Sequence, residues 1–277
     1  MKRIRKGITA LVLMLTLVMA ILPANASTTS IVRQESLNLG DDSWVAESNS
    51  NDAEGWSWDK GSRTLTLRSI DFSTEGPAIL LPGDSTVVLV NGTENKIHAK
   101  GSSIYAYGDC TIRGGSLTIT GDNVGIYGKS ILLDVCTIHI TNEKYISDSG
   151  MLQIPTYFIS AESLTLKSST LIGSVGQEGI NCSTLKAVDS VIEMENTIAS
   201  SIFAEDASFQ NSRLQLRNCA LMMLTQCTFD GCTVSLQNIN TGLRTYGAQF
   251  VSCILDISAT GEISELDGIG VVGVHGA

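Results

Sequence analysis

The amino-acid sequence predicts an all-β fold, a right-handed parallel β-helix solenoid with about 21 residues and three short strands in each coil. Three observations lead to this prediction. One short apolar pattern recurs along the chain at a nearly constant interval. Two further alternating apolar pairs precede each copy at fixed offsets, and the interval is too short to hold a helix as well.

The recurring pattern reads small–x–apolar–x–apolar, from Gly115–Ile119 to Cys253–Ile257. Its small position falls at Gly115, Cys136, Ser169, Ser190, Ser212, Cys232 and Cys253. The successive gaps are therefore 21, 33, 21, 22, 20 and 21 residues. The one long gap contains the polar stretch 142–155, which we interpret as an inserted loop.

Equivalent strands of successive coils are expected to stack into three parallel sheets about 4.8 Å apart. Each inward side chain then lies on the same position of the next coil, which explains columns of like residues. One such column contains Phe209, Phe229 and Phe250. A second contains Asn196, Asn218 and Asn238, whose side-chain amides are predicted to hydrogen-bond along the axis. The right-handed coiling follows from the chirality of parallel crossovers.

The chain contains seven cysteines, an odd number. Most of them occupy inward positions of the repeat, where a thiol behaves as a small buried apolar group. The inward cysteines are Cys110, Cys136, Cys227, Cys232 and Cys253. A disulfide between Cys232 and Cys253 on neighbouring coils is a less favoured alternative, and a metal site is less favoured again because no C-x-x-C pair exists.

The N-terminal 26 residues have the features of a secretory signal peptide. A basic patch at 2–6 precedes the apolar run Ile8–Leu22, and Ala24 and Ala26 provide a cleavage site. The alternative is an uncleaved anchor helix, although the apolar run is short for one. We therefore predict a secreted protein, extracellular or associated with the cell surface, with no membrane insertion once the signal is removed.

Residues 27–63 lack the repeat and contain Trp44, Trp56 and Trp58. Because an open solenoid exposes strand edges and core at its ends, we interpret this segment as an N-terminal cap. The β-helix itself is predicted to occupy 64–277. The formal net charge of −10 argues against nucleic acid and anionic membranes as partners.

Parallel β-helices often carry pectin lyases and polygalacturonases, so we compared the outward positions with what such enzymes need. A lyase requires clustered carboxylates and a basic residue, and a hydrolase requires paired carboxylates. On two of the predicted sheets, no two acidic residues occupy the same outward position of adjacent coils. We therefore predict no catalytic residues and no cofactor.

The outward column of the remaining sheet contains Tyr105 and Tyr127, which should lie side by side, one coil apart. Aromatic rings at that spacing can contact the apolar faces of pyranose rings. The predicted insertion and its end add Tyr145 and Tyr157 nearby in sequence. These four tyrosines are our candidate carbohydrate-binding residues. The alternative is that exposed tyrosines reflect strand propensity and shield the sheet.

The stretch from Trp56 to Asn142 resembles a known family. The motifs are Trp56-Ser-Trp58-Asp59, Leu65-Thr-Leu67, Gly76-Pro-Ala-Ile79 with Leu81-Pro82, Ser85-Thr-Val87, Ile104-Tyr-Ala106 and Gly125-Ile-Tyr127. They are similar to those of secreted carbohydrate-binding domain-containing proteins of Gram-positive bacteria, whose β-helix is pectate-lyase-like without the catalytic residues. The resemblance implies binding of extracellular polysaccharide, aided in some relatives by calcium. The coils here lack a clear cluster of surface aspartates.

The sequence thus leads us to expect a non-catalytic, secreted or cell-surface module that binds polysaccharide through the Tyr105/Tyr127 face. The second interpretation is a structural or adhesive surface protein that binds a protein partner. The third is a pectin-type polysaccharide lyase or hydrolase.

Overall fold

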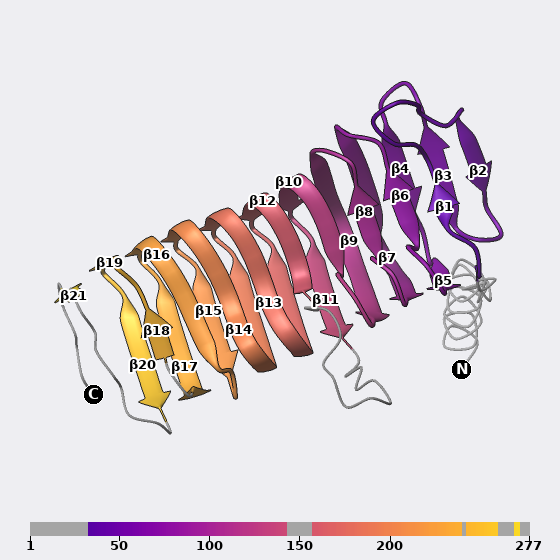
Figure 1. The fold of residues 1–277 in the computed structure, drawn as a ribbon. Coiled ribbons are helices and arrows are strands. Elements are labelled where there is room, and N and C mark those ends of the chain that lie inside the picture. Colours follow the sequence, from indigo (N-terminus) through magenta and orange to yellow (C-terminus); the bar gives the residue numbers. More distant parts are fainter. Residues whose placement is uncertain (1–32, 143–156, 240–241, 260–268, 272–277) are drawn as a thin grey trace, which may run out of the picture.

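The computed structural model describes residues 33–142, 157–239, 242–259 and 269–271. These residues form a parallel β-solenoid of about eight coils with about 22 residues per coil, and they contain no helix. Figure 1 shows the coils stacked along one axis, from the indigo N-terminal strands to the yellow C-terminal ones. None of the described segments is a helix that could span a membrane. The predicted signal peptide, Tyr145 and all but Asn142 of the predicted inserted loop lie outside the described residues.

Each coil contributes to three parallel sheets, and several strands run through a corner from one sheet into the next. The strands that begin the solenoid are β1 (Leu37–Asn38), β4 (Thr64–Leu67), β5 (Asp71–Thr74), β6 (Ile79–Leu81), β7 (Ser85–Ala99), β8 (Ile104–Ala106) and β9 (Cys110–Gly121). Those of the middle are β10 (Ile126–Asp134), β11 (Thr137–Asn142), β12 (Tyr157–Lys167), β13 (Thr170–Val188) and β14 (Val191–Gln210). The last are β15 (Arg213–Arg217), β16 (Leu221–Asp230), β17 (Thr233–Ile239), β18 (Gly242–Arg244), β19 (Gly247–Val251), β20 (Ile254–Ala259) and β21 (Ile269–Val271).

We name the sheets by the register of their strands. The first sheet contains residues 79–81, 104–106, 126–128, 159–161, 180–182, 202–204, 222–224 and 242–244. The second sheet contains residues 85–89, 110–113, 131–134, 164–167, 185–188, 207–210, 227–230 and 247–251. The third sheet contains the recurring pattern, from 71–74 to 254–259. The register continues unchanged across the predicted insertion, because Ile126 pairs with Ile159 and Ile138 with Leu171.

The predicted columns are present. Phe209 and Phe229 are stacked with ring centroids 4.5 Å apart, and Phe229 and Phe250 with centroids 4.8 Å apart. The Asn218 amide donates to Asn196 at 3.2 Å, and the Asn238 amide donates to Asn218 at 3.1 Å. These three asparagines have φ between 52° and 59°, a conformation that asparagine adopts more readily than most residues. The asparagine ladder therefore supplies both the turn geometry and hydrogen bonds between coils.

The small column of the recurring pattern forms a second ladder, between side chains and backbone. The Ser190 hydroxyl donates to the Val188 carbonyl at 2.7 Å and accepts from the Ser169 backbone N–H at 3.2 Å. Ser212 repeats this arrangement one coil later, and the thiol of Cys232 takes the same place beyond it. Serine and cysteine both occur in this column because either side chain is small and can accept the buried N–H.

The cysteines are free thiols, and all except the half-buried Cys253 are buried. Burial raises the pKa of Cys110 to about 12 and that of Cys182 to about 12. Burial at the predicted inward positions is confirmed for four cysteines, whereas Cys253, near the C-terminal end of the solenoid, is half-buried and packs against the core.

The N-terminal end is closed by an antiparallel meander of β2 (Asn49–Asn51), β3 (Trp56–Asp59) and β4. Trp56 and Trp58 are buried, whereas Trp44 is 46% exposed. The segment predicted as a cap also starts the solenoid, because β1 pairs in parallel with β6 of the first sheet.

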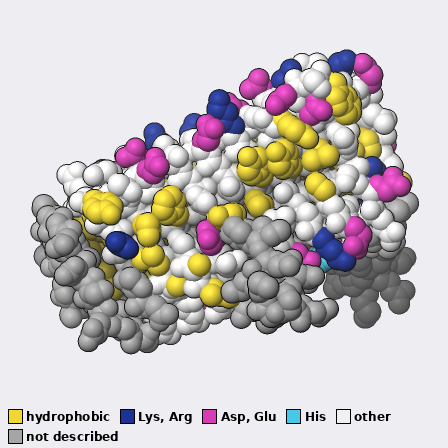
Figure 2. Space-filling model, in the orientation of Figure 1, with side chains coloured by type: hydrophobic (Ala, Val, Ile, Leu, Met, Phe, Trp, Pro, Cys, Tyr) yellow, Lys and Arg dark blue, Asp and Glu magenta, His cyan; other side chains and the backbone are white. Residues whose placement is uncertain are grey.

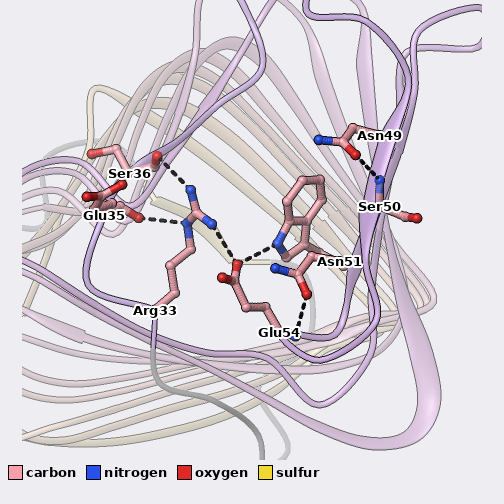
Figure 3. A network of polar contacts seen from close by, with 8 residues as sticks. Arg33, Glu35, Ser36, Asn49, Ser50, Asn51 and Glu54 are labelled. Atoms are coloured by element: carbon pink, nitrogen blue, oxygen red, sulfur yellow. Dashed lines mark hydrogen bonds and ion pairs between the residues drawn. The ribbon is translucent and has the colours of Figure 1, made fainter.

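An ion pair joins two parts of this N-terminal segment (Figure 3). The Arg33 guanidinium lies 2.6 Å from the Glu54 carboxylate, which also accepts a hydrogen bond from the Trp56 indole at 2.8 Å. Arg33 also donates to two backbone carbonyls and lies 5.8 Å from the Phe72 ring centroid. Because both charged side chains are less than one-fifth exposed, this pair is screened less than the surface pairs.

Candidate functional site

The outward column of the first sheet contains the two tyrosines that the repeat placed together. The register of successive strands gives the order Leu80, Tyr105, Tyr127, Ser160, Asn181, Phe203, Met223 and Arg244. The polar Ser160 and Asn181 thus lie between the tyrosines on one side and Phe203 on the other. Figure 2 shows hydrophobic side chains gathered on this face of the solenoid.

Tyr105 and Tyr127 lie on neighbouring coils, as predicted, but their rings face each other. The centroids are 4.7 Å apart and the ring planes differ by 18°. Tyr107 packs edge-on against Tyr105, with centroids 5.0 Å apart. The two stacked tyrosines therefore cover each other's inner faces and do not form a flat platform for two successive sugars. The face of Tyr127 that points away from Tyr105 is left open, because the next residue of the column is the short Ser160.

A hollow of about 480 Å³ lies against this open face. Tyr127, with Tyr105 and Tyr107 beyond it, lines one end, Phe203 lines the other, and Ser160 and Asn181 form the floor between Tyr127 and Phe203. Three coil steps separate Tyr127 from Phe203, a distance of roughly 14 Å along the axis. The hollow exists because a serine and an asparagine stand where the flanking coils carry large rings.

Charged side chains line the rim of this hollow. Asp42, from the segment after β1, lies beside the tyrosines, and Lys129 and Glu162 lie at the corner that leads to the second sheet. None of the three forms an ion pair within the described part of the chain. Burial raises the pKa of the Tyr105 hydroxyl, and the neighbouring Tyr127, Tyr107 and Asp42 raise it further. Tyr105 therefore remains a neutral hydroxyl that can donate or accept a hydrogen bond.

Tyr157 lies beside the hollow and is not part of its lining. It pairs in register with Glu178, and its hydroxyl is hydrogen-bonded to Glu178 and to Asn181. Burial raises the pKa of Glu178, and the hydrogen bond from Tyr157 partly offsets that effect. Tyr157 thus lies close to Asn181, which forms part of the floor of the hollow.

Of the four predicted site residues, the structure brings Tyr105 and Tyr127 together in one hollow and places Tyr157 next to it. Ser160, Tyr107 and Asp42 also line the hollow and were not predicted as site residues. Period-two alternation beyond Tyr105 could have identified Tyr107 as outward-facing. Asp42 reaches the site from a segment outside the repeat, so no periodic signal marks it.

This arrangement can bind a ligand by contact with an aromatic face and by neutral hydrogen bonds. The open side of Tyr127 offers an apolar surface, whereas Ser160 and Asn181 offer a hydroxyl and an amide. Within the described residues, no group of three or more histidine, cysteine or acidic side chains could hold a metal ion.

No protein-family model, no curated protein and no solved structure matches the chain. The resemblance to carbohydrate-binding β-helix proteins therefore rests on the sequence motifs alone. The structure shows that the chain is a parallel β-solenoid.

Proposed function

We propose that this chain is a secreted or cell-surface module that binds polysaccharide without cleaving it. The observation that carries the proposal is the hollow between Tyr127 and Phe203, with one open aromatic face and a neutral polar floor. Sugar rings combine an apolar C–H face with equatorial hydroxyls, and carbohydrate sites accordingly combine aromatic faces with hydrogen-bonding side chains. The predicted signal peptide supports an extracellular location.

The proposal differs from the sequence-based expectation in how the tyrosines act. A sugar ring would lie against the free face of Tyr127. Tyr105 stacks on the other face of Tyr127 and holds the tyrosine ring in place. The hydroxyls of the sugar would meet Ser160 and Asn181. Asp42 and Glu162 outnumber Lys129 on the rim, so a neutral or cationic glycan is favoured over a polyuronate such as pectate.

A protein-binding role is the second candidate, and one observation favours it. In the last described coils, Tyr246 is 77% exposed, Ile254 is 67% exposed and Ile257 is 48% exposed. Exposed apolar side chains are typical of protein interaction sites, and these three belong to the same coil, Tyr246 between β18 and β19 and the two isoleucines in β20.

A depletion assay separates the two roles. The purified chain without its predicted signal peptide would be mixed with insoluble cellulose, chitin, pectate and peptidoglycan, with and without calcium. We expect saturable retention on a neutral or cationic glycan, loss of that retention in Tyr127→Ala, and no loss in the control Tyr246→Ala, which removes an exposed tyrosine outside the hollow. The absence of retention on every glycan, in either calcium condition, would refute the proposal and favour the protein-binding role.

A further inference from the structure

A second hollow, of about 490 Å³, lies on the corner between the first and second sheets. It adjoins the Tyr127 hollow in the chain, because Ser183 lines the first hollow and the next residue, Thr184, lines the second. Its floor consists of the inward-facing Leu185, Ala207, Cys227 and Ala248. Its sides are two outward columns that stay in register over successive coils.

The first of these columns runs from Thr184 through Asp206 and Gln226 to Gly247. The second runs from Ser208 through Thr228 to Gln249. The hollow follows both columns across successive coils. It is therefore a groove walled by hydroxyls, amides and one carboxylate, directed along the solenoid axis.

The polar side chains of this groove have no hydrogen-bond or ion-pair partner among the described residues. This holds for Thr184, Asp206, Ser208, Gln226, Thr228 and Gln249. The polar side chains of the third sheet differ in this respect. There, Thr141 is hydrogen-bonded to Ser174 at 2.8 Å, and Ser235 donates to Asp256 at 3.4 Å. The groove thus presents hydrogen-bonding groups that the fold does not use.

We propose that this groove is a second subsite for the same polysaccharide, so that one glycan chain occupies both hollows. This inference rests on the proposed function of the Tyr127 hollow. Together the two hollows extend from the coil of Tyr105 to the coil of Gln249, which is six coil steps or roughly 29 Å along the axis. A ligand of that length is an oligosaccharide of several sugar units.

The chemistry of the groove restricts the class of glycan. Asp206 is the one charged side chain in its lining, and Lys186 lies one coil step before Ser208 in the same outward column. A uronate chain would place its carboxylates beside Asp206 inside the groove, whereas Lys186 lies outside the lining, and this arrangement disfavours a uronate there. Neutral sugars, by contrast, can exchange hydrogen bonds with glutamine amides and threonine hydroxyls. We therefore assign the groove to neutral oligosaccharides, for which gluco-oligosaccharides serve as probes.

Length dependence of binding tests the inference. Isothermal titration would compare cellobiose with cellohexaose, and chitobiose with chitohexaose, on the full chain without its signal peptide. Because the second subsite acts on an already bound chain, the hexamer is expected to bind at least about tenfold more tightly than the dimer. Ser208→Trp, which fills the groove, should reduce hexamer affinity to that of the dimer and leave dimer affinity unchanged.

Two further variants keep the test decisive. Thr86→Trp adds the same bulk to the same outward column of the second sheet near the N-terminal end, and should not affect either ligand. Gln226→Ala removes a hydrogen-bonding group without adding bulk, and should weaken hexamer binding only.

Equal affinities of the wild type for dimer and hexamer, or hexamer binding that Ser208→Trp leaves unchanged, would overturn the second subsite and leave the proposed function intact. If none of the four sugars binds the wild type, the second subsite is refuted together with binding of neutral gluco-oligosaccharides at the Tyr127 hollow. Retention on an insoluble glycan of another kind would then preserve the proposed function itself.

Discussion

Replacement of Ser190 tests whether the serine and cysteine ladder holds neighbouring coils together. Ser190 is 2% exposed, and its hydroxyl is the partner of the buried Ser169 backbone N–H. Ser190→Ala leaves that N–H without an acceptor in a place that water does not reach. An unsatisfied buried donor costs about 1–3 kcal/mol, so we expect the free energy of unfolding to fall by about that amount.

The chain itself supplies the rescue variant. In the same column, the Cys232 sulfur accepts from the Ser212 backbone N–H at 3.5 Å, so Ser190→Cys retains an acceptor at this position. We expect Ser190→Cys to recover most of the lost stability. Ser208→Ala is the matched control, because its outward hydroxyl has no partner among the described residues, and its effect should stay within about 0.5 kcal/mol.

Urea unfolding followed by far-ultraviolet circular dichroism measures these differences as changes in the transition midpoint at constant slope. The reasoning would be refuted if Ser190→Ala were as stable as the wild type, or if Ser190→Cys were less stable than Ser190→Ala.

Three other predictions concern the remaining ladders and the cap. Phe229→Ala removes the middle ring of the phenylalanine stack and should lower the free energy of unfolding by about 3–5 kcal/mol, measured by urea unfolding; a loss below 1 kcal/mol would contradict the close packing. Asn218→Ala should lose about 1–2 kcal/mol, because it breaks two hydrogen bonds and strains a residue at φ 52°, whereas Asn218→Gly should lose less; the reverse order in thermal unfolding would count against the strain argument. Burial acts to raise the pKa of Glu54, but hydrogen bonds from Trp56 and Arg33 outweigh it and lower that pKa. Its contribution to stability is therefore present above the unfolded-state pKa of about 4.3 and is lost as pH falls through the lower folded-state pKa. Glu54→Gln should reduce the loss of stability on acidification, and an unchanged pH profile would argue against the ion pair.

The solenoid could be predicted because its repeat encodes both the strand period and the stacking. A spacing near 21 residues with period-two alternation allows few other folds, and columns of like residues fix the register. The Phe209–Phe250 stack and the Asn196–Asn238 ladder followed directly from that register. They could be identified because identical side chains recur at equal intervals in the sequence.

The geometry of the candidate site was less predictable. The repeat placed Tyr105 next to Tyr127, but ring orientation depends on side-chain rotamers, which backbone spacing does not determine. Ser160, which leaves the Tyr127 face open, follows the long gap in the repeat and was therefore not assigned to the column. Asp42 comes from the cap, whose sequence does not repeat.

The most direct test of the central claim is a crystal structure of the chain with cellohexaose or chitohexaose bound. We predict electron density for a sugar ring against the face of Tyr127 that points toward Ser160, with sugar hydroxyls within hydrogen-bonding distance of the Asn181 amide. Density for the sugar on the third sheet, with the Tyr127 hollow empty, would contradict the proposed site.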